Sequence, residues 1–211
     1  RKSPAGSGTQ TACLAFGGDE TTGYTESYNG TNWTELNDLI RPRQLLGSST
    51  SGTTTASLAF GGLYGGNPTT AVTESWNGTN WTEVNDLNTA RSGMGGVGDS
   101  YEFALSVGGQ TSPGYVASNE LWNGSNWTEV GDLNTGRGTP GESGNAAAAL
   151  VAGGASNNES YSGKTESWNG TNWTEFNDMN VYRTRLGGTG SNTSSLAFGG
   201  EAPPNTAATE E

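Results

Sequence analysis

The chain offers few side chains that could catalyse a reaction. It contains no histidine and a single cysteine, so it lacks the commonest general base and cannot build a thiolate metal site. Its carboxylates recur with the period of a sequence repeat: Glu26, Glu74, Glu120, Glu166 and Glu210 form one series, and Glu35, Glu83, Glu129 and Glu175 form a second. A catalytic acid–base pair should break such a symmetry. We therefore predict that the protein is not an enzyme and needs neither a metal nor a cofactor.

The arginines could form a binding site. Five of the nine basic residues occupy one position of the repeat: Arg1, Arg43, Arg91, Arg137 and Arg183. In a closed ring of repeats these side chains would lie on one rim, where they could bind an anion or an acidic glycan. In the alternative interpretation, each guanidinium group pairs with a carboxylate or with backbone carbonyls and ties neighbouring repeats together. Full pairing within the protein would remove the anion site.

A tryptophan-containing stretch recurs along the chain and sets its organisation. Residues 74–91 read E-S-W-N-G-T-N-W-T-E-V-N-D-L-N-T-A-R, and close copies begin at Glu26, Glu120 and Glu166. The second tryptophan position falls at Trp33, Trp81, Trp127 and Trp173, with spacings of 48, 46 and 46 residues. Such a period is typical of propeller blades and other stacked repeats. The predicted structural core consists of these tryptophans together with Trp76, Trp122 and Trp168, and Cys13 is predicted to be a small core residue.

Composition excludes several classes of function. Only 30% of the residues are hydrophobic and the net charge is −12, which alone would suggest disorder, but the regular aromatic pairs indicate a folded unit that buries them. Nucleic acid is not an expected partner, because nine Lys and Arg residues cannot form a basic stripe. Membrane insertion is not expected, since the longest apolar run, residues 146–152, is far shorter than the roughly 20 residues of a spanning helix. The first residue is not methionine, which indicates a removed leader or a longer parent polypeptide.

Each period divides into four short segments with strand character. In the third period these are residues 91–98, rich in glycine, residues 103–109, with alternating apolar side chains, residues 118–122 and residues 127–130. An Asn-Gly turn joins the last two segments, because both residue types tolerate a positive φ. The predicted blades are residues 1–39, 40–87, 88–133 and 134–179, followed by an incomplete blade at residues 180–211.

The repeat resembles a known family. A double glycine ends the second segment, a glutamate and an aromatic residue lie in the third, a tryptophan lies in the fourth and an arginine precedes the next unit. This pattern covers essentially the whole chain and resembles the kelch repeat of β-propellers, although the loop between the two aromatics is shorter. The resemblance implies an all-β fold, a single β-propeller of about five four-stranded blades whose fifth blade lacks its outermost strand. The copper radical oxidases built on kelch propellers require histidines, which this chain lacks.

The resemblance also implies how each blade is arranged. In kelch propellers the first strand is innermost and the fourth is outermost. The glycine-rich first segments agree with this order, because strands that crowd a central axis need small residues.

A second likeness bears on function. The N-G-T-N turn is similar to the Asn-, Gly- and Thr-rich repeats of phage and marine-microbial structural proteins. It implies a non-catalytic structural and recognition module of an extracellular or virion appendage, resembling a phage tail or fibre, that binds other appendage or virion proteins or cell-surface glycans. The alternative is a multivalent glycan-binding propeller, whose equivalent pockets would give avidity. The unpaired edge of the fifth blade could accept a strand from another segment or chain.

Variation between repeats predicts where a partner binds, because scaffold positions should recur whereas binding positions need not. The variable segments lie between the second and third strands, at residues 19–25, 63–70, 110–118, 155–164 and 201–205. They should cluster on one face of a rigid ring, where loops usually carry recognition. Tyr64, Tyr115 and Tyr161 lie in these segments and are further candidate binding residues.

Overall fold

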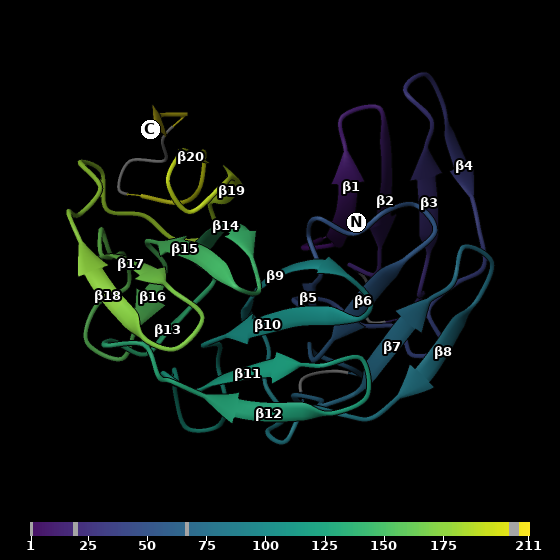
Figure 1. Cartoon of the computed structure of the whole chain (residues 1–211), viewed down its shortest axis with the longest axis horizontal. Helices are drawn as coiled ribbons and strands as arrows, with labels where there is room; N and C mark the ends of the chain where they lie inside the picture. Colours follow the sequence, from purple (N-terminus) through teal and green to yellow (C-terminus); the bar gives the residue numbers. More distant parts are fainter. Residues whose placement is uncertain (1, 19–20, 66–67, 203–206) are drawn as a thin grey trace.

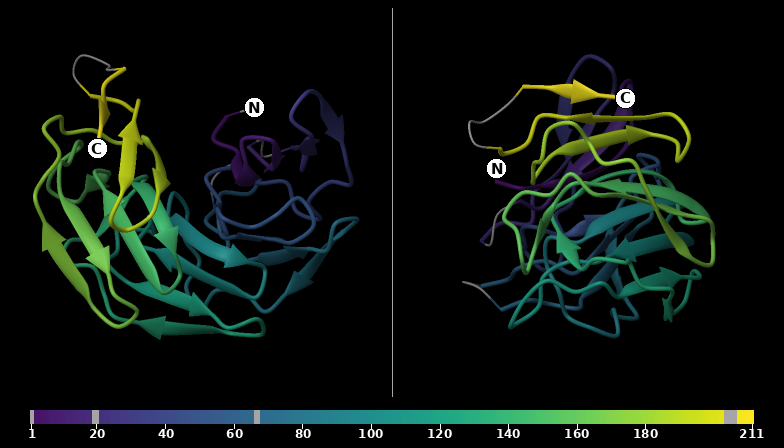
Figure 2. Two further views of the ribbon diagram at one scale, coloured as in Figure 1. Left: turned by 45° about the horizontal axis from the view of Figure 1, so that its top comes forward. Right: turned by 90° about the vertical axis from the view of Figure 1, so that its left-hand side faces the viewer.

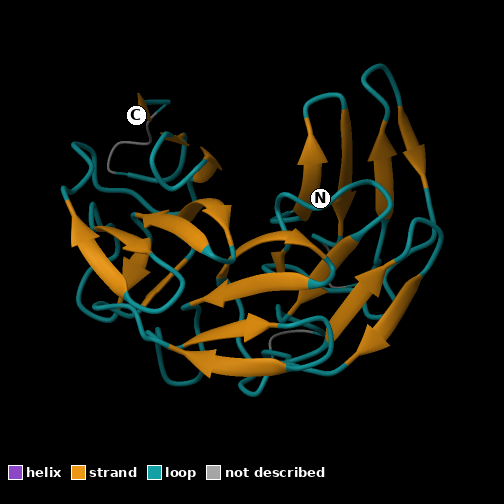
Figure 3. Cartoon of the chain, in the orientation of Figure 1, coloured by secondary structure: helices purple, strands orange, loops and turns teal. Residues whose placement is uncertain are grey.

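The computed structural model describes residues 2–18, 21–65, 68–202 and 207–211. This part of the chain consists of strands, turns and loops, and it contains no helix that could cross a membrane. Five small antiparallel sheets arranged in a ring form a five-bladed β-propeller (Figures 1 and 3). The predicted fold class is confirmed, including a last blade with only three strands.

The strands follow one another through the blades in sequence order. Blade 1 contains β1 (Ala5–Thr9), β2 (Ala12–Phe16), β3 (Thr25–Tyr28) and β4 (Trp33–Glu35), and blade 2 contains β5 (Gly47–Ser48), β6 (Ser57–Phe60), β7 (Thr73–Trp76) and β8 (Trp81–Val84). Blade 3 contains β9 (Gly95–Ser100), β10 (Phe103–Val107), β11 (Asn119–Trp122) and β12 (Trp127–Val130). Blade 4 contains β14 (Gly141–Asn145), β15 (Ala148–Ala152), β17 (Thr165–Trp168) and β18 (Trp173–Phe176), with β13 (Arg137–Gly138) and β16 (Ala155–Ser156) paired beside it. Blade 5 contains β19 (Gly187–Gly190), β20 (Ser195–Phe198) and β21 (Thr209–Glu210).

The first strand of each blade lies at the hub, which we define as the inner strands β1, β5, β9, β14 and β19. These strands contact one another in order around the axis, whereas the fourth strands lie at the rim (Figure 1). Glycine permits this close approach. A Cβ atom on Gly96 would lie 2.6 Å from the backbone nitrogen of Ser48 in the preceding blade, and one on Gly188 would lie 2.4 Å from the carbonyl oxygen of Glu142.

The outer hairpins owe their shape to the Asn-Gly turn. The Asn77 Oδ1 atom accepts hydrogen bonds from the backbone N–H groups of Thr79 and Asn80, both at 2.9 Å, and Gly78 has a φ of 92°. The turns that begin at Asn29, Asn123 and Asn169 are built in the same way. Asparagine therefore recurs because its side chain closes the turn. The turn places Trp76 directly opposite Trp81 in the ladder.

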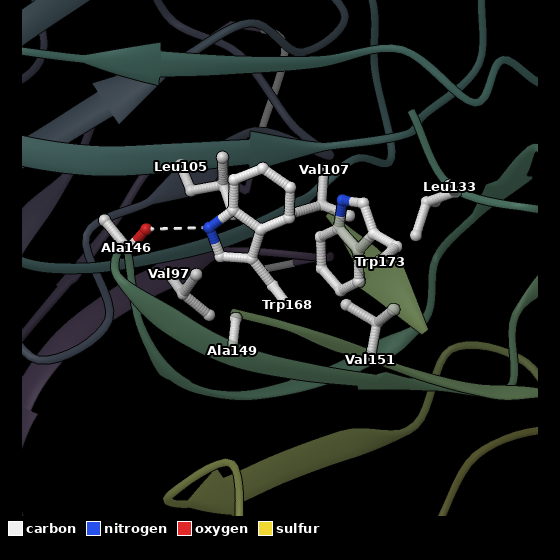
Figure 4. Close-up of a cluster of buried hydrophobic side chains, with 9 residues drawn as sticks. All are labelled: Val97, Leu105, Val107, Leu133, Ala146, Ala149, Val151, Trp168 and Trp173. Atoms are coloured by element: carbon white, nitrogen blue, oxygen red, sulfur yellow. Dashed lines mark hydrogen bonds between the residues drawn. The ribbon is translucent and has the colours of Figure 1, made fainter. Parts of the chain in front are cut away.

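The core lies between consecutive blades. Figure 4 shows the largest cluster, in which Trp168 and Trp173 of blade 4 pack against Leu105 and Val107 of blade 3. The Trp168 indole N–H donates to the carbonyl oxygen of Ala146 at 3.1 Å, so its polar atom is satisfied inside the protein. The buried tryptophans are Trp76, Trp81, Trp122, Trp127, Trp168 and Trp173.

The prediction that Trp33 lies in the core is wrong. Its side chain is 51% exposed, although it occupies the same position of the repeat as the buried Trp81 and Trp127. Trp81 and Trp127 each pack against the preceding blade. Trp33 has no such neighbour, because blade 5, at the other end of the ring, stands apart from blade 1 (Figure 2). Cys13 is partly exposed rather than fully buried.

Candidate functional site

A series of backbone hydrogen bonds rings one mouth of the hub. The N–H of Leu45 donates to the carbonyl oxygen of Ser3 at 3.3 Å, that of Gly93 to Leu45 at 2.8 Å, that of Thr139 to Gly93 at 2.6 Å and that of Arg185 to Thr139 at 2.9 Å. All five residues have a positive φ, between 51° and 57°. This conformation favours glycine, yet four of the five positions carry side chains. These side chains can therefore differ from blade to blade while the backbone stays the same.

A cavity of about 260 Å³ opens above this mouth. Its walls come from the connections between the second and third strands of blades 3, 4 and 5, which the structure brings to one face of the ring. Its lining comprises Leu45, Gly93, Gln110, Tyr115, Thr139, Ala155, Ser156, Ser160, Tyr161, Thr184, Arg185 and Glu201. Two of the three candidate tyrosines therefore line one cavity, together with a planar amide, several hydroxyl groups and an ion pair. We call this cavity the tyrosine cavity and the face that carries it the loop face.

The walls of the tyrosine cavity are held in place by hydrogen bonds between loops. The backbone N–H of Tyr115 donates to Asn157 Oδ1, and Asn157 Nδ2 donates to the carbonyl oxygen of Tyr115, both at 2.9 Å. The Tyr115 ring lies over Gly138, where an added Cβ atom would come within 2.7 Å of it. Arg185 Nη1 lies 2.7 Å from Glu201 Oε1 in a partly exposed ion pair. The cavity is thus formed before any ligand enters.

A second cavity of about 410 Å³ lies on the same face, between the loops of blades 2 and 3. It shares Gln110 with the tyrosine cavity and is otherwise lined by Leu63, Pro68, Thr69, Ser92, Thr111, Ser112 and Pro113. The third candidate tyrosine, Tyr64, follows Leu63 in sequence, and 43% of its side chain is exposed. The variable loops 19–25, 63–70 and 201–205 each lie partly outside the described residues.

The candidate arginines lie inside the blades and not at the hub mouth. Arg43, Arg91, Arg137 and Arg183 have almost no exposed side-chain surface, and each pairs with the glutamate of the third strand of its own blade: Glu74, Glu120, Glu166 and Glu210. Their Nη1 atoms also donate to backbone carbonyls, as Arg137 does to Lys164 at 2.6 Å. Burial lowers the pKa of the Arg43, Arg91 and Arg137 guanidinium groups and raises the pKa of Glu74.

These guanidinium groups are not accessible to an anion at the mouth. The geometry instead matches the alternative interpretation, in which the arginines are paired within the protein. Arg1 lies outside the described residues. The carbonyl oxygen of Arg91 accepts the N–H of Gly62 in blade 2 at 2.9 Å, so the same residue also links two blades.

Glu142 breaks the symmetry of the hub, and the sequence analysis missed it. It lies in β14 opposite Val151, at the position that Gly6, Ser48, Gly96 and Gly188 occupy in the other inner strands. Its side chain lines a cavity of about 240 Å³ that continues past Leu45, Gly93, Thr139 and Arg185. Comparing the first strands position by position would have revealed it, because the other four residues there are glycine or serine.

Burial raises the pKa of Glu142 to about 8, and a hydrogen bond from the Gly96 backbone opposes that rise. In the unfolded chain this carboxyl group would ionise near its ordinary value of 4.5. Stabilisation by the neutral group is therefore complete below about pH 4.5, decreases as the pH rises and is lost above the folded pKa of about 8.

Replacing Glu142 with glutamine should remove this pH dependence. We expect the Glu142→Gln variant to be more stable than the unmodified chain at pH 9, by roughly 2–4 kcal/mol, and close to it at pH 4. Urea unfolding followed by tryptophan fluorescence from pH 4 to pH 9 measures the difference. Glu129→Gln, on an exposed position of β12, is the control. Parallel stability curves for the unmodified chain and Glu142→Gln would contradict the assignment.

No group of three His, Cys, Asp or Glu side chains that could hold a metal ion is found in the part of the chain that the structure describes. No protein-family model matches the sequence, and no curated protein matches it.

Proposed function

We propose that this protein is a non-catalytic structural and recognition module whose kelch-like propeller binds a partner through its loop face. The observation that carries the proposal is the convergence of three loops of different sequence on the tyrosine cavity. The repeated residues build the blades, whereas residues that differ between blades line the cavity. A rigid ring that presents variable loops is a common design for recognition.

The setting we propose is an extracellular or virion appendage, comparable to a phage tail or tail fibre. Two features support this setting. The sequence of the Asn-, Gly- and Thr-rich repeats resembles that of phage and marine-microbial structural proteins, and the composition is polar and strongly acidic. Partners in such a setting are other appendage or virion proteins or cell-surface glycans. A nucleic acid partner and membrane insertion are not part of the proposal.

A glycan ligand is the second candidate, and the lining of the tyrosine cavity favours it. Tyr115 and Tyr161 offer aromatic surface that can stack on a sugar ring, while Gln110 and Ser160 offer donors and acceptors for hydroxyl groups. The Arg185–Glu201 ion pair adds charged groups at the edge of the cavity. The blades do not share these residues, so we expect one main sugar site instead of five equivalent ones.

A glycan array with the full chain tests the glycan candidate. We expect binding that free sugar competes, and a loss of roughly tenfold or more in affinity for Tyr161→Ala. Tyr101→Ala is the matched control, because Tyr101 is exposed at the opposite end of β10, away from the loop face. Equal losses for both variants would contradict a site in the tyrosine cavity. If no glycan binds, a protein partner is the remaining candidate. Pull-down experiments with loop-face variants test it.

A further inference from the structure

Blades 1, 2 and 3 meet through a repeated aromatic contact. The Phe16 ring of blade 1 packs edge-on against Trp81 of blade 2, with ring centroids 4.8 Å apart, and Phe60 of blade 2 packs in the same way against Trp127 of blade 3 at 4.9 Å. Both phenylalanines are fully buried. The second strand of one blade thus provides the phenylalanine, and the fourth strand of the next blade provides the tryptophan.

A hydrogen bond accompanies each of these contacts. The Trp81 indole N–H donates to Thr25 Oγ1 at 2.9 Å, and that of Trp127 donates to Thr73 Oγ1 at 3.0 Å. Both threonines lie in the third strand of the preceding blade and have no exposed surface. Blades 1 and 2 therefore each present two different faces: one with phenylalanine and threonine, and one with tryptophan.

The two ends of the ring expose one face each. On blade 5, Phe198 occupies the position of Phe16 and Phe60, but 43% of its side chain is exposed, and the neighbouring Leu196 is 40% exposed. On blade 1, Trp33 occupies the position of Trp81 and is 51% exposed. Figure 2 shows these two blades on either side of the opening in the ring. The phenylalanine and the tryptophan that contact each other inside the ring are thus exposed at its two ends.

The sheet of blade 5 has an open edge next to this face. Within the described residues β21 pairs with β20 only, whereas the third strands of the other blades pair on both sides. Thr209 of β21 occupies the position of Thr25 and Thr73, and it is exposed. Exposed strand edges of this kind accept further strands.

We infer that the opening between blade 5 and blade 1 is a docking site for one further copy of the same repeat. A fourth strand preceding this copy would pair with β21, and the blade that follows it would contact Trp33. The inference follows from continuity with the interfaces inside the ring, because one further copy of the repeat presents a tryptophan to Phe198 and a phenylalanine to Trp33. A second copy of the whole chain fits less well, since the five blades already occupy most of the ring (Figure 2).

The probe for this docking is a polypeptide with the sequence of residues 29–87, which contains a fourth strand, β4, followed by one complete blade that carries both Phe60 and Trp81. Mixed with the full chain, it should form a 1:1 complex and raise the thermal midpoint. Isothermal titration calorimetry and sedimentation measure the complex. The docking does not depend on the loop face, so its outcome is separate from that of the proposed function.

Two variants of the full chain locate the contact. Trp33→Ala and Phe198→Ala change exposed side chains, so both variants should fold, and each should weaken binding of the probe by roughly tenfold or more. Phe176→Ala, at an equally exposed aromatic of β18, should leave the affinity unchanged. The inference is overturned if no complex forms or if Trp33→Ala and Phe198→Ala both bind the probe with unchanged affinity. It is also overturned if the full chain alone self-associates through Trp33 and Phe198.

Discussion

Replacing Arg91 with alanine is expected to destabilise the propeller by about 3–5 kcal/mol. The Arg91 side chain is fully buried, donates to the carbonyl oxygen of Ser118 at 2.6 Å and forms an ion pair with Glu120. Its removal would leave the Glu120 carboxylate buried without a countercharge and the carbonyl without a donor. Equilibrium unfolding in urea at pH 7, followed by fluorescence, measures the loss.

The ion pair of Arg185 and Glu201 is the matched control. Its nitrogen–oxygen distance is 2.7 Å, but its side chains are 60% and 45% exposed, so water solvates both charges. Arg185→Ala should therefore cost less than about 1 kcal/mol. A double variant, Arg91→Met with Glu120→Leu, should recover only part of the loss. It removes both buried charges together, but the N–H groups of Asn88 and Thr89 lose their acceptor and the Ser118 carbonyl stays without its donor. Similar losses for Arg91→Ala and Arg185→Ala would show that the buried pair does not hold the blade.

The repeat made the fold predictable from the sequence. The Asn-Gly turn at Asn77 and Gly78 is a local signal, since the side chain and the backbone of the turn itself fix its geometry. Strand order followed from the resemblance to kelch repeats, and the glycine-rich inner strands agreed with it. The pattern of residues within each repeat identifies the strands, and its recurrence in register gives each strand its place in the blade. Neither inference required knowledge of contacts between residues distant in sequence.

The ends of the ring were not predictable in the same way. Trp33 has the same neighbours in sequence as Trp81, yet the two differ in burial because only Trp81 has a preceding blade to pack against. Its environment depends on whether the ring continues past blade 1, which the repeat does not encode. The prediction that every second tryptophan lies in the core therefore failed at one position.

The candidate site was predicted in part. The variable loops indicated the loop face and two of the tyrosines that line its cavity. Side chains that differ between blades are not needed to build the common scaffold, so their variation indicates binding. Glu142 and the positive-φ residues at the hub mouth were missed. The conformation of Leu45 or Thr139 is set by hydrogen bonds to the adjacent blade, and their residue types give no sign of it.

Replacing Trp127 with alanine is the second large expected loss, of about 3–5 kcal/mol. Trp127 packs edge-on against Phe60, lies against Trp122 and donates its indole N–H to Thr73, so its removal leaves a cavity between two blades and takes away the donor to the buried Thr73 hydroxyl group. Trp33→Ala provides an internal control, because it removes the same residue from the same position of the repeat where no blade covers it. We expect that variant to lose less than about 1 kcal/mol. Thermal and urea unfolding of the two variants compare these values directly, and equal losses would mean that the contact between blades contributes little beyond what each hairpin supplies itself.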